Sequence, residues 1–437
     1  MDAITDKSFC VCDFGLFTEL AIHLARKTTG KVRSYVPWQG AFPFINDRLV
    51  GDGIPNIERI DDPLDPEVLD STDVYCFPDI FNSGMQLALE RLGKQVWGSR
   101  KGDELERKRL WFRKLQEELG LPVPEYTAVR GLEKLRAFLA DHGRCFVKSS
   151  PDWRGTHETW ESKDGEQSEF ILDYLAVKFG PVKNDVLFMV EEPIEVPYEA
   201  GFDSICVDDQ FSETPVNGIE IKGKLLLASA QTNSKTPKFI DEAMKALGPT
   251  LRERRYRNFM SGEFRDGKLT DPCCRAPNPG LGCEMEMISN LPLLIEAGSR
   301  GELLKVDFEY EFGVQIAIWH DHPEDLCKQF RIDAEVRQWV KLMDVCQSGP
   351  LCQIVPRPPH GTKIGWIVGV GNTIQEMADH AQEVGEALKD LPIEISMDAL
   401  PEAIEQAQKA QQGGDEFTDQ EIPDPASVLE EAENSRK

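Results

Sequence analysis

The sequence predicts an α/β protein in which a parallel α/β domain is followed by a larger module with a small α+β lid. The first observation is that short apolar runs alternate with amphipathic segments over residues 8–100, the pattern of strands joined by helical crossovers. The second is a series of strand patterns after residue 186 that includes one two-residue Asp-Gly hairpin. The third is the length of 437 residues, which is enough for two or three domains.

Residues 1–100 carry the elements of the parallel domain. Apolar runs predict buried strands, and the helical spacing of apolar residues predicts the helices between them. This region contains no Gly-x-Gly-x-x-Gly motif, so a dinucleotide is not its expected ligand. We expect strands at residues 9–13, 31–36, 74–77 and 95–97, and helices at residues 16–26 and 85–92.

Residues 101–195 are expected to form a helix, the lid and a hinge. The helix starts at Glu104 and is closed by Gly120 and Pro122, which are common helix stop signals. The remaining elements are a strand–helix pair over residues 127–142, strands at residues 144–148 and 186–190, and a helix at residues 170–179.

Residues 196–400 are expected to form the central and C-terminal part of the larger module. Residues 401–437 are rich in Gln, Gly, Asp and Glu, a composition that predicts a flexible acidic tail. The expected strands are residues 202–207, 218–221, 224–229, 256–264, 312–318 and 351–355, and the expected helices are residues 238–247, 290–297 and a segment that ends at residue 388.

The composition restricts the class of partner. The formal net charge is −27, which argues against binding to nucleic acid or to an anionic membrane surface. No run reaches the roughly 18 apolar residues of a bilayer-spanning helix, and the first residues lack the layout of a signal peptide. The 11 cysteines include no Cys-x-x-Cys pair, so buried reduced thiols are expected rather than disulfides or zinc. A cytoplasmic protein fits these properties best.

An acidic hairpin is the first candidate site. Glu263 lies on a predicted strand, Asp266 and Gly267 form the turn, and Asp271 comes just after the returning strand. A two-residue Asp-Gly turn fixes the register of a hairpin, so the two flanking carboxylates are predicted to point to one face. Mg²⁺ is usually held by one or two carboxylates together with the phosphates of a nucleotide. With Arg275 behind them, the pair predicts a cradle for a magnesium-bridged triphosphate.

Other motifs lie upstream in an order that resembles the ATP-grasp superfamily. Lys108 precedes a Gly-x-Pro turn, Lys148 ends a Phe-Val-Lys strand, and an apolar strand runs into Glu191. The resemblance covers residues 75–390, and its nearest named member is the glycinamide ribonucleotide synthetase (phosphoribosylamine–glycine ligase) family, including virus-encoded relatives. It implies a pre-ATP-grasp α/β domain over residues 1–100, followed by an ATP-grasp module with its lid.

The resemblance implies roles for the cations. Lys108 and Lys148 would neutralise phosphates, as lysine does with its point charge. Arg275 would act with Lys148 in catalysis on the transferring phosphoryl group. For Lys108 the alternative is a solvated helix charge, because Arg107 and Arg109 flank it. The loop after Lys148 is poor in glycine, whereas many members of the superfamily carry several glycines there.

The hinge motif implies the nucleotide contacts. Glu191 ends the hinge strand, the carbonyl of Glu192 would accept the adenine amino group, and the amide of Ile194 would donate to a ring nitrogen. Pro193 lacks an amide, but its position faces away in the alternating pattern. Glu199, eight residues after the hinge glutamate, would meet the ribose. The alternative for this stretch is an edge strand with solvated acids.

The metal motif departs from the pattern of the superfamily. Where members carry Glu-x-Asn-x-Arg, this chain has Asp271 in the first place and Cys273 in the place of the asparagine. Glu263 and Asp271 would hold Mg²⁺, but a thiol is a poor magnesium ligand. Glu284 or Glu286 could supply the missing oxygen. The alternative is a hairpin whose acids face solvent.

The resemblance as a whole implies an ATP- and Mg²⁺-dependent carboxylate–amine ligase. Phosphoryl transfer from ATP would make an acylphosphate of a carboxylate substrate, which an amine would then attack. The expected partners are ATP, a small carboxylate and an amine, with no nucleic acid and no membrane, and the oligomeric state is open. Two alternatives remain, a small-molecule kinase with the same ATP cradle and a nucleotide-binding or structural protein that kept the fold without turnover.

Overall fold

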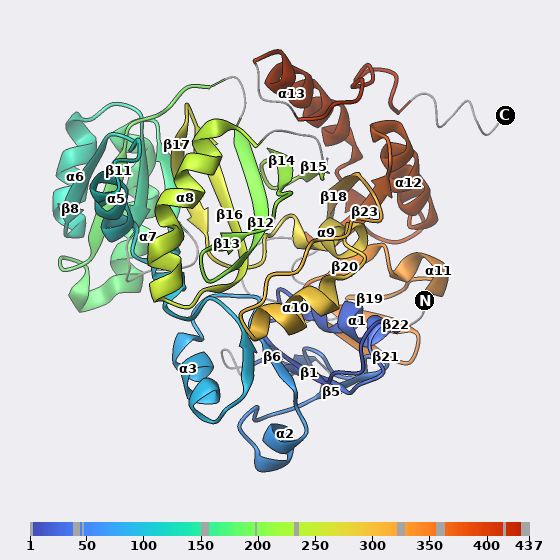
Figure 1. Ribbon diagram of the computed structural model, residues 1–437. Helices are drawn as coiled ribbons and strands as arrows, with labels where there is room; N and C mark the ends of the chain where they lie inside the picture. The colour runs from blue at the N-terminus through green and yellow to red at the C-terminus, as the bar shows by residue number, and fades with distance from the viewer. Residues whose placement is uncertain are drawn as a thin grey trace. The chain divides into compact units, whose positions relative to one another are not determined.

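The structure is a computed structural model in which the chain forms two compact units, coloured along the chain in Figure 1. Unit 1 contains Met1–Gly102, Pro197–Ser261 and Cys274–Lys437, and unit 2 contains Asp103–Val196 and Gly262–Cys273. The α/β class with a parallel N-terminal sheet is confirmed. The structure describes residues 3–37, 44–45, 48–149, 157–196, 199–230, 236–320, 328–354, 363–413 and 417–429.

Unit 1 begins with a five-stranded parallel sheet in the order β5-β2-β1-β6-β7. The central strand β1 is buried along its whole length, as is usual for strands of parallel sheets. The strand order reverses between β1 and β6, and ligands of open α/β sheets usually bind at the carboxyl ends of such strands. The elements of this region are β1 (Phe9–Cys12), α1 (Thr18–Lys27), β2 (Val32–Tyr35), β5 (Ile57–Arg59), α2 (Pro66–Asp70), β6 (Val74–Cys76), α3 (Ser83–Arg91), β7 (Gln95–Trp97) and the separate pair β3 (Phe44–Ile45) and β4 (Arg48–Leu49).

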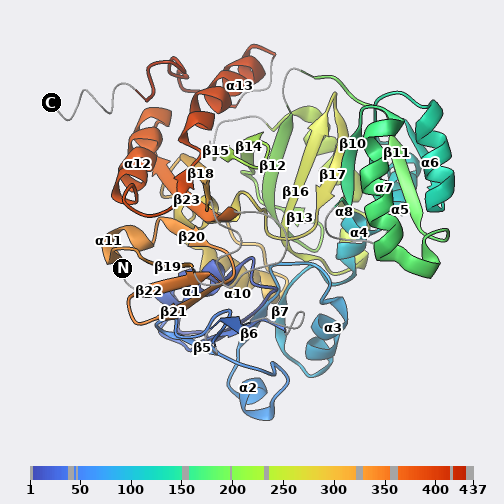
Figure 2. The same cartoon turned by 180° about the vertical axis from the view of Figure 1, so that it is seen from behind.

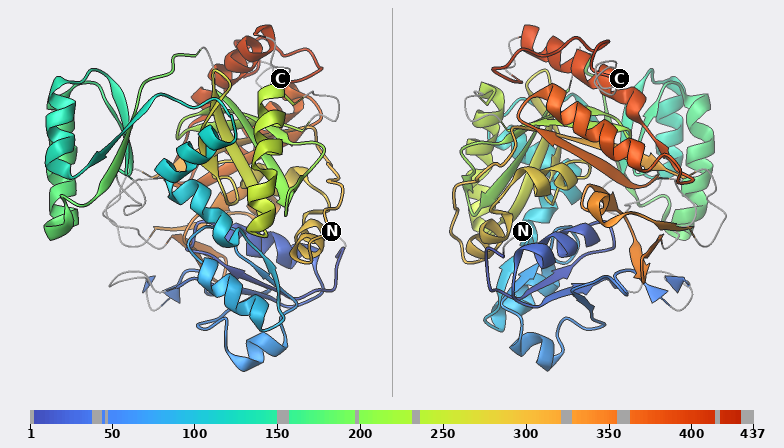
Figure 3. Two further views of the ribbon diagram at one scale, coloured as in Figure 1. Left: turned by 60° about the vertical axis from the view of Figure 1, so that its left-hand side comes forward. Right: turned by 90° about the vertical axis from the view of Figure 1, so that its right-hand side faces the viewer.

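A larger sheet forms the rest of unit 1, in the order β16-β12-β14-β15-β18-β23-β20. The strand pairs from β12 to β20 are antiparallel, and β13 and β24 pair with β12 and β18. Apolar residues of α12 and α13 join the core of this sheet, and Figure 3 (right) shows both helices lying across it.

The bounds of these elements follow the sequence expectations to within a few residues in most cases. The strands are β12 (Ala200–Val207), β13 (Gln210–Phe211), β14 (Val216–Ile221), β15 (Leu225–Ser229), β16 (Arg257–Arg265), β18 (Phe312–Trp319), β20 (Val340–Leu342), β23 (Lys363–Gly371) and β24 (Glu394–Ile395), with β19 (Lys328–Arg331), β21 (Val345–Ser348) and β22 (Leu351–Ile354) in a three-stranded sheet. The helices are α8 (Lys238–Glu253), α9 (Leu281–Met287), α10 (Leu291–Ser299), α11 (Ala334–Arg337), α12 (Ile374–Ala387) and α13 (Leu400–Gln412).

Unit 2 has a four-stranded antiparallel sheet in the order β10-β9-β11-β8. Helices α6 and α7 lie side by side on one face of this sheet, as Figures 2 and 3 show. Leu135 and Leu172 of these helices share a buried core with Val147 of the sheet. The elements are α4 (Glu104–Arg107), α5 (Arg109–Glu118), β8 (Tyr126–Arg130), α6 (Leu132–Asp141), β9 (Cys145–Ser149), β10 (Thr159–Ser162), α7 (Gly165–Phe179), β11 (Leu187–Glu191) and β17 (Lys268–Cys273).

The predicted Asp-Gly hairpin joins β16 to β17. Asp266 has φ 51° and Gly267 has φ 68°, as a type I′ turn requires. Beyond the turn, the Thr270 hydroxyl donates to the Glu263 carbonyl at 3.0 Å. Asp271 lies within β17, whereas the sequence argument placed it just after the strand.

The charged helix expected over residues 104–120 is broken in the structure. Lys108, with φ −99° and ψ 62°, separates α4 from α5 and is not helical. The break changes which of the neighbouring cations faces the lid, as described below. Among the helices of the described chain, none combines the length and the apolar character that crossing a membrane requires.

The expected flexible tail is partly packed. Helix α13 extends to Gln412, and Phe417 and Val428 are buried in the core of unit 1. These apolar side chains are isolated among charged and small residues, so the composition of residues 401–437 hides them. The prediction of a flexible segment is therefore wrong for Leu400–Gln412, Phe417 and Val428.

Candidate nucleotide site

A buried lysine and a buried glutamate form the centre of a charged cluster in unit 2. Lys148 lies on β9 and Glu191 ends β11, and the two strands are paired. The Lys148 Nζ lies 3.0 Å from Glu191 Oε2 and donates to the Thr270 carbonyl at 3.2 Å. The structure thus brings together two residues that the sequence predicts for nucleotide binding.

Arg113 on α5 is a third member of this cluster, which the sequence motifs did not indicate. Its guanidinium is buried and donates to Glu191 Oε1 at 2.7 Å. It also donates to Gln116 Oε1 at 2.7 Å and to the Leu269 carbonyl at 3.0 Å. Burial by itself would raise the pKa of Glu191, but the charges of Lys148 and Arg113 lower it below its ordinary value.

Arg109 brings a second buried guanidinium to the lid. Only 6% of its surface is exposed, and it donates to the Ser149 carbonyl at 2.9 Å and to Glu158 Oε1 at 3.2 Å. Its Nε–H is buried and has no hydrogen-bond partner among the described residues. Lys108, the predicted phosphate ligand, has 45% of its side chain exposed and pairs with Glu104 at 2.9 Å. The helix break at Lys108 thus leaves Arg109 as the cation that reaches the lid strand.

The ion pairs of this region join three cations to two carboxylates. Lys148 and Arg113 share the carboxylate of Glu191, and Arg109 contacts Glu158, which is partly exposed. Phosphate oxygens match the planar N–H fork of arginine. Residues 150–156, the glycine-poor loop after Lys148, lie outside the described residues.

The predicted adenine contacts lie on the hinge after β11. The Glu192 amide donates to the Glu125 carbonyl at 3.1 Å, and its carboxylate lies 2.9 Å from the His142 Nε2. Ile194 is partly buried. Glu199, the predicted ribose ligand, belongs to unit 1, where its carboxylate lies 3.9 Å from the Lys222 ammonium. The contacts of the Glu192 carbonyl and the Ile194 amide with adenine stay predictions.

The two predicted magnesium ligands lie on the hairpin of unit 2, and both are partly exposed. Regular pairing across a two-residue turn places Glu263 opposite Thr270, so Asp271 would face the other side of the hairpin. Thr270 and Asp271 are both partly exposed. The common face that the sequence predicts for the two carboxylates stays a prediction.

Arg275, the predicted phosphate contact behind the acids, belongs to unit 1. It pairs with Asp79 at 3.1 Å, at the carboxyl end of β6. Asp13 follows β1 at the same edge of the parallel sheet, and its carboxylate accepts from the Phe17 amide at 2.6 Å. Burial, together with the charges of Asp79 and Asp344, raises the pKa of Asp13 to about 7.

Glu284 and Glu286, the suggested replacements for the missing asparagine, have other partners in unit 1. Glu284 shares a buried hydrogen bond with Asp203, and burial raises the pKa of both carboxyls. Glu286 forms an ion pair with the Lys341 ammonium. Both carboxylates are therefore engaged within unit 1.

The cysteines of the described chain are mostly buried. None of the ten forms a disulfide, and only Cys273 among them is partly exposed, as expected for buried thiols. Within the described ranges, no group of three or more His, Cys, Asp or Glu side chains is arranged to hold a metal ion.

No protein-family model and no curated protein sequence matches the chain, but solved structures do. Phosphoribosylamine–glycine ligase from Thermotoga maritima has a TM-score of 0.63 at 14% identity, over 89% of this chain and 97% of that one. The biotin carboxylase domain of Hydrogenobacter thermophilus 2-oxoglutarate carboxylase has a TM-score of 0.60 at 12% identity, over 99% and 98%. L-amino acid ligase from Bacillus licheniformis has a TM-score of 0.54 at 15% identity, over 89% and 98%. The chain has the ATP-grasp fold.

Within this ATP-grasp fold, Arg109 and Arg113 are the candidate residues that the motifs missed. Together with Gln116 they recur at helical spacing and form one polar row on α5. All three are buried, although the sequence suggests a solvated, charged helix. The sequence feature that could have indicated these residues is the polar row, because three polar side chains on one face of a helix with apolar neighbours indicate a polar partner.

Proposed function

We propose that the protein is an ATP- and Mg²⁺-dependent carboxylate–amine ligase. The observation that carries the proposal is the set of buried cations in unit 2, in a chain with the ATP-grasp fold: Lys148 and Arg113 contact Glu191, and Arg109 donates to the carbonyl of Ser149. Such a cluster suits the triphosphate of ATP. Two of the three similar structures are named ligases, and the third is a complex with MgADP, ADP and bicarbonate, which supports the proposal.

In the proposed reaction, a carboxylate oxygen of the substrate attacks the γ-phosphorus of ATP, the P–O bond to ADP breaks, and an acylphosphate forms. An amine then attacks the acyl carbon, the C–N bond forms, and the C–O bond to phosphate breaks. The amine loses its proton to the departing phosphate or to water. Positioning and electrostatic stabilisation account for most of the catalysis in this chemistry.

The cations of unit 2 are assigned to the phosphates. Lys148 and Arg109 bind phosphate oxygens, and Arg113 holds Glu191 so that the Lys148 ammonium keeps its position. Arg275 of unit 1 is assigned to the transferring phosphoryl group. Desolvation strengthens each of these contacts because the effective dielectric constant of a buried site is low.

Glu263 and Asp271 are the residues that would hold Mg²⁺. Both are partly exposed carboxylates on one hairpin, and hard oxygen donors of this kind fit the ion. When bound, Mg²⁺ neutralises part of the negative charge of the phosphates. The hinge is assigned to the base, with the Glu192 carbonyl and the Ile194 amide on adenine and Glu199 on the ribose.

The second candidate is a nucleotide-binding protein without turnover, and Cys273 favours it. The partly exposed thiol stands where a ligating amide oxygen is expected, and sulfur binds Mg²⁺ poorly. A protein of this kind would bind ATP through the same cluster without releasing products.

Product analysis separates the candidates. The full chain is incubated with ATP, Mg²⁺ and pools of small carboxylates and amines, and the products are identified by mass spectrometry and a phosphate assay. A ligase yields ADP, free phosphate and an amide in equal amounts. ADP with a phosphorylated product and no free phosphate indicates a kinase, and bound ATP without ADP formation indicates the second candidate.

A further inference from the structure

Two contacts tie the hinge segment, residues 192–195, to the short connection between α6 and β9. At the start of the segment, Glu192 Oε1 lies 2.9 Å from the His142 Nε2. At its end, the Glu195 carboxylate pairs with the Arg144 guanidinium. Both partners belong to the same connection and are separated by one residue. One short piece of chain therefore holds both ends of the segment to which adenine is assigned.

The His142 side chain is held in place by its own helix. Its ring stacks on the Phe138 ring, with the centroids 4.6 Å apart and an angle of 29° between the planes. Its amide donates to the Leu139 carbonyl at 3.4 Å, and 29% of the side chain is exposed. A side chain that packing already fixes loses little conformational entropy when it contacts a carboxylate. His142 is therefore suited to hold Glu192 in one position.

Glu192 is fixed by its side chain and by its amide. Val190 lies in the buried core that α6 covers, and Glu192, two residues further along the chain, points to the same side of the sheet. The intervening Glu191 points to the opposite side, where it contacts Lys148. The Glu192 amide donates to the Glu125 carbonyl at 3.1 Å, and among the described residues its carbonyl accepts no hydrogen bond. The carbonyl is thus the group of this residue that is left for a ligand.

The contact at the other end of the segment is weaker. Arg144 pairs with Glu195 and also with Glu161 of β10. The side chains of Arg144 and Glu195 are largely exposed, and exposed ion pairs contribute little. The stacked and less exposed His142 is therefore expected to do more than Arg144 to fix the hinge segment.

We propose that His142 is a positioning residue for the base of the nucleotide and that it sets the preference for adenine over guanine. The inference rests on the proposed function, because it concerns the residue that holds the hinge carbonyl assigned to adenine. Adenine presents an amino group to this carbonyl, whereas guanine presents a carbonyl oxygen at the same position. Two facing acceptors leave both groups unpaired, so a rigid hinge rejects guanine. A hinge that is free to rotate would adapt to either base.

The affinities of the full chain for MgATP and MgGTP, measured by calorimetry, test the proposal. We expect the wild type to bind MgATP at least about tenfold more tightly than MgGTP. His142→Ala should lower this ratio about fivefold, chiefly by weakening MgATP, because it removes one hydrogen bond to a carboxylate. His142→Gln keeps an N–H at a similar distance along the side chain, so it should restore most of the ratio.

Lys134→Ala is the matched control on α6. Its side chain is exposed and lies on the same helix, so the ratio should equal that of the wild type. An unchanged ratio in His142→Ala, with a melting temperature near that of the wild type, overturns the proposal. An equal loss in His142→Ala and His142→Gln also overturns it, because the N–H contact would then not be the cause.

Glu192→Ala removes the same contact from the side of the hinge and keeps the backbone carbonyl. It should lower the ratio as much as His142→Ala does. In the double variant the ratio should fall no further than in either single variant, because the two side chains act through one contact. Additive losses in the double variant contradict the proposal.

The same titrations separate this inference from the proposed function. A wild type that binds neither nucleotide, with and without Mg²⁺, contradicts both. A wild type that binds MgATP and MgGTP equally, or MgATP binding that does not respond to His142, contradicts the positioning role alone and leaves the ligase proposal standing.

Discussion

The two units each contain a buried lysine on a strand, and the comparison of the two shows how neighbours decide a role. Lys148 in unit 2 pairs with Glu191 and donates to a backbone carbonyl, and Lys341 in unit 1 does the same with Glu286. In both pairs the cation lowers the pKa of the buried glutamate below its ordinary value. The two units therefore contain the same kind of buried lysine–glutamate ion pair.

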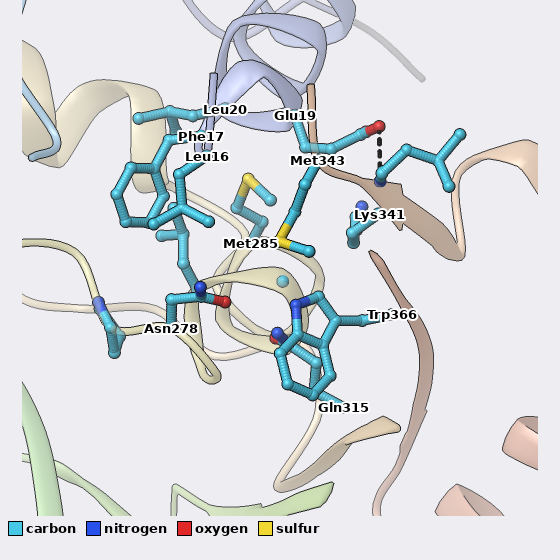
Figure 4. Close-up of a pocket in the computed structure, with 14 residues that line it drawn as sticks. Leu16, Phe17, Glu19, Leu20, Asn278, Met285, Gln315, Lys341, Met343 and Trp366 are labelled. Atoms are coloured by element: carbon cyan, nitrogen blue, oxygen red, sulfur yellow. Dashed lines mark hydrogen bonds between the residues drawn. The ribbon is translucent and has the colours of Figure 1, made fainter. Parts of the chain in front are cut away.

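The surroundings of the two pairs differ. Lys148 shares Glu191 with the buried guanidinium of Arg113, and the buried Arg109 donates to the carbonyl of the next residue, Ser149. Lys341 instead lines a small hollow of unit 1 beside apolar side chains such as Leu16 and Met343 (Figure 4). The group of buried cations in unit 2 suits a compact, charged group such as phosphate.

The largest effect is expected at Lys148. Lys148→Gln removes a charge-assisted contact to phosphate, so the Kd of MgATP should rise about 10- to 100-fold in calorimetry. Lys183→Gln is the control within unit 2, because that lysine pairs with Glu133 on the surface and should change the Kd less than twofold. An unchanged Kd in a folded Lys148→Gln protein would remove the phosphate role from the cluster.

Variants of the adjacent cations Lys108 and Arg109 test which of the two binds phosphate in unit 2. Arg109→Gln should raise the Kd of MgATP about tenfold, because the buried guanidinium has an Nε–H left for a ligand. Lys108→Gln should have less than a twofold effect, because an exposed ion pair such as that with Glu104 contributes little. The opposite order of effects would restore the assignment that the sequence suggests.

Asp13 in the parallel sheet of unit 1 should make the stability of the protein depend on pH. The pKa of Asp13 is raised from 3.8 to about 7, so the folded state holds its proton more tightly than the unfolded state. Stability should therefore fall as the pH rises between these values, by about 1.4 kcal/mol per pH unit, and level off above pH 7. Asp13→Asn should remove this part of the slope in urea denaturation.

The exposed Asp70 of the same sheet region is the control for this titration. Asp70→Asn should follow the wild-type pH profile, because the Asp70 side chain is exposed to solvent and does not share the buried surroundings of Asp13. If Asp13→Asn keeps the wild-type slope, the Asp13 carboxylate is ionised in the folded protein at neutral pH.

Local patterns were sufficient for most of the fold. The apolar strand of residues 9–13 and the Asp-Gly turn at Asp266 each depend on the character of a few neighbouring residues, and the structure agrees with both. The break of the helix at Lys108 and the burial of Val428 are different, because contacts with distant parts of the chain fix them. No local pattern carries that information.

The sequence could predict those residues of the candidate site that lie at the ends of strands. Lys148 and Glu191 follow apolar runs, which mark the ends of buried strands. Arg113 was not found, because its partners Glu191 and Leu269 are far from it in the sequence. The small hollow of unit 1 that Leu16, Met285 and Trp366 line was not found either, because these residues are far apart in the sequence and meet only in the folded chain.

The most direct test of the ligase proposal is ATP binding by calorimetry, with and without Mg²⁺, for the wild type and Asp271→Asn. Asp266→Asn on the turn of the same hairpin is the matched control, because asparagine also tolerates its positive φ. We predict micromolar binding that requires Mg²⁺, weakens about tenfold in Asp271→Asn and is unchanged in Asp266→Asn. Absence of ATP binding with and without Mg²⁺ would contradict the proposed function.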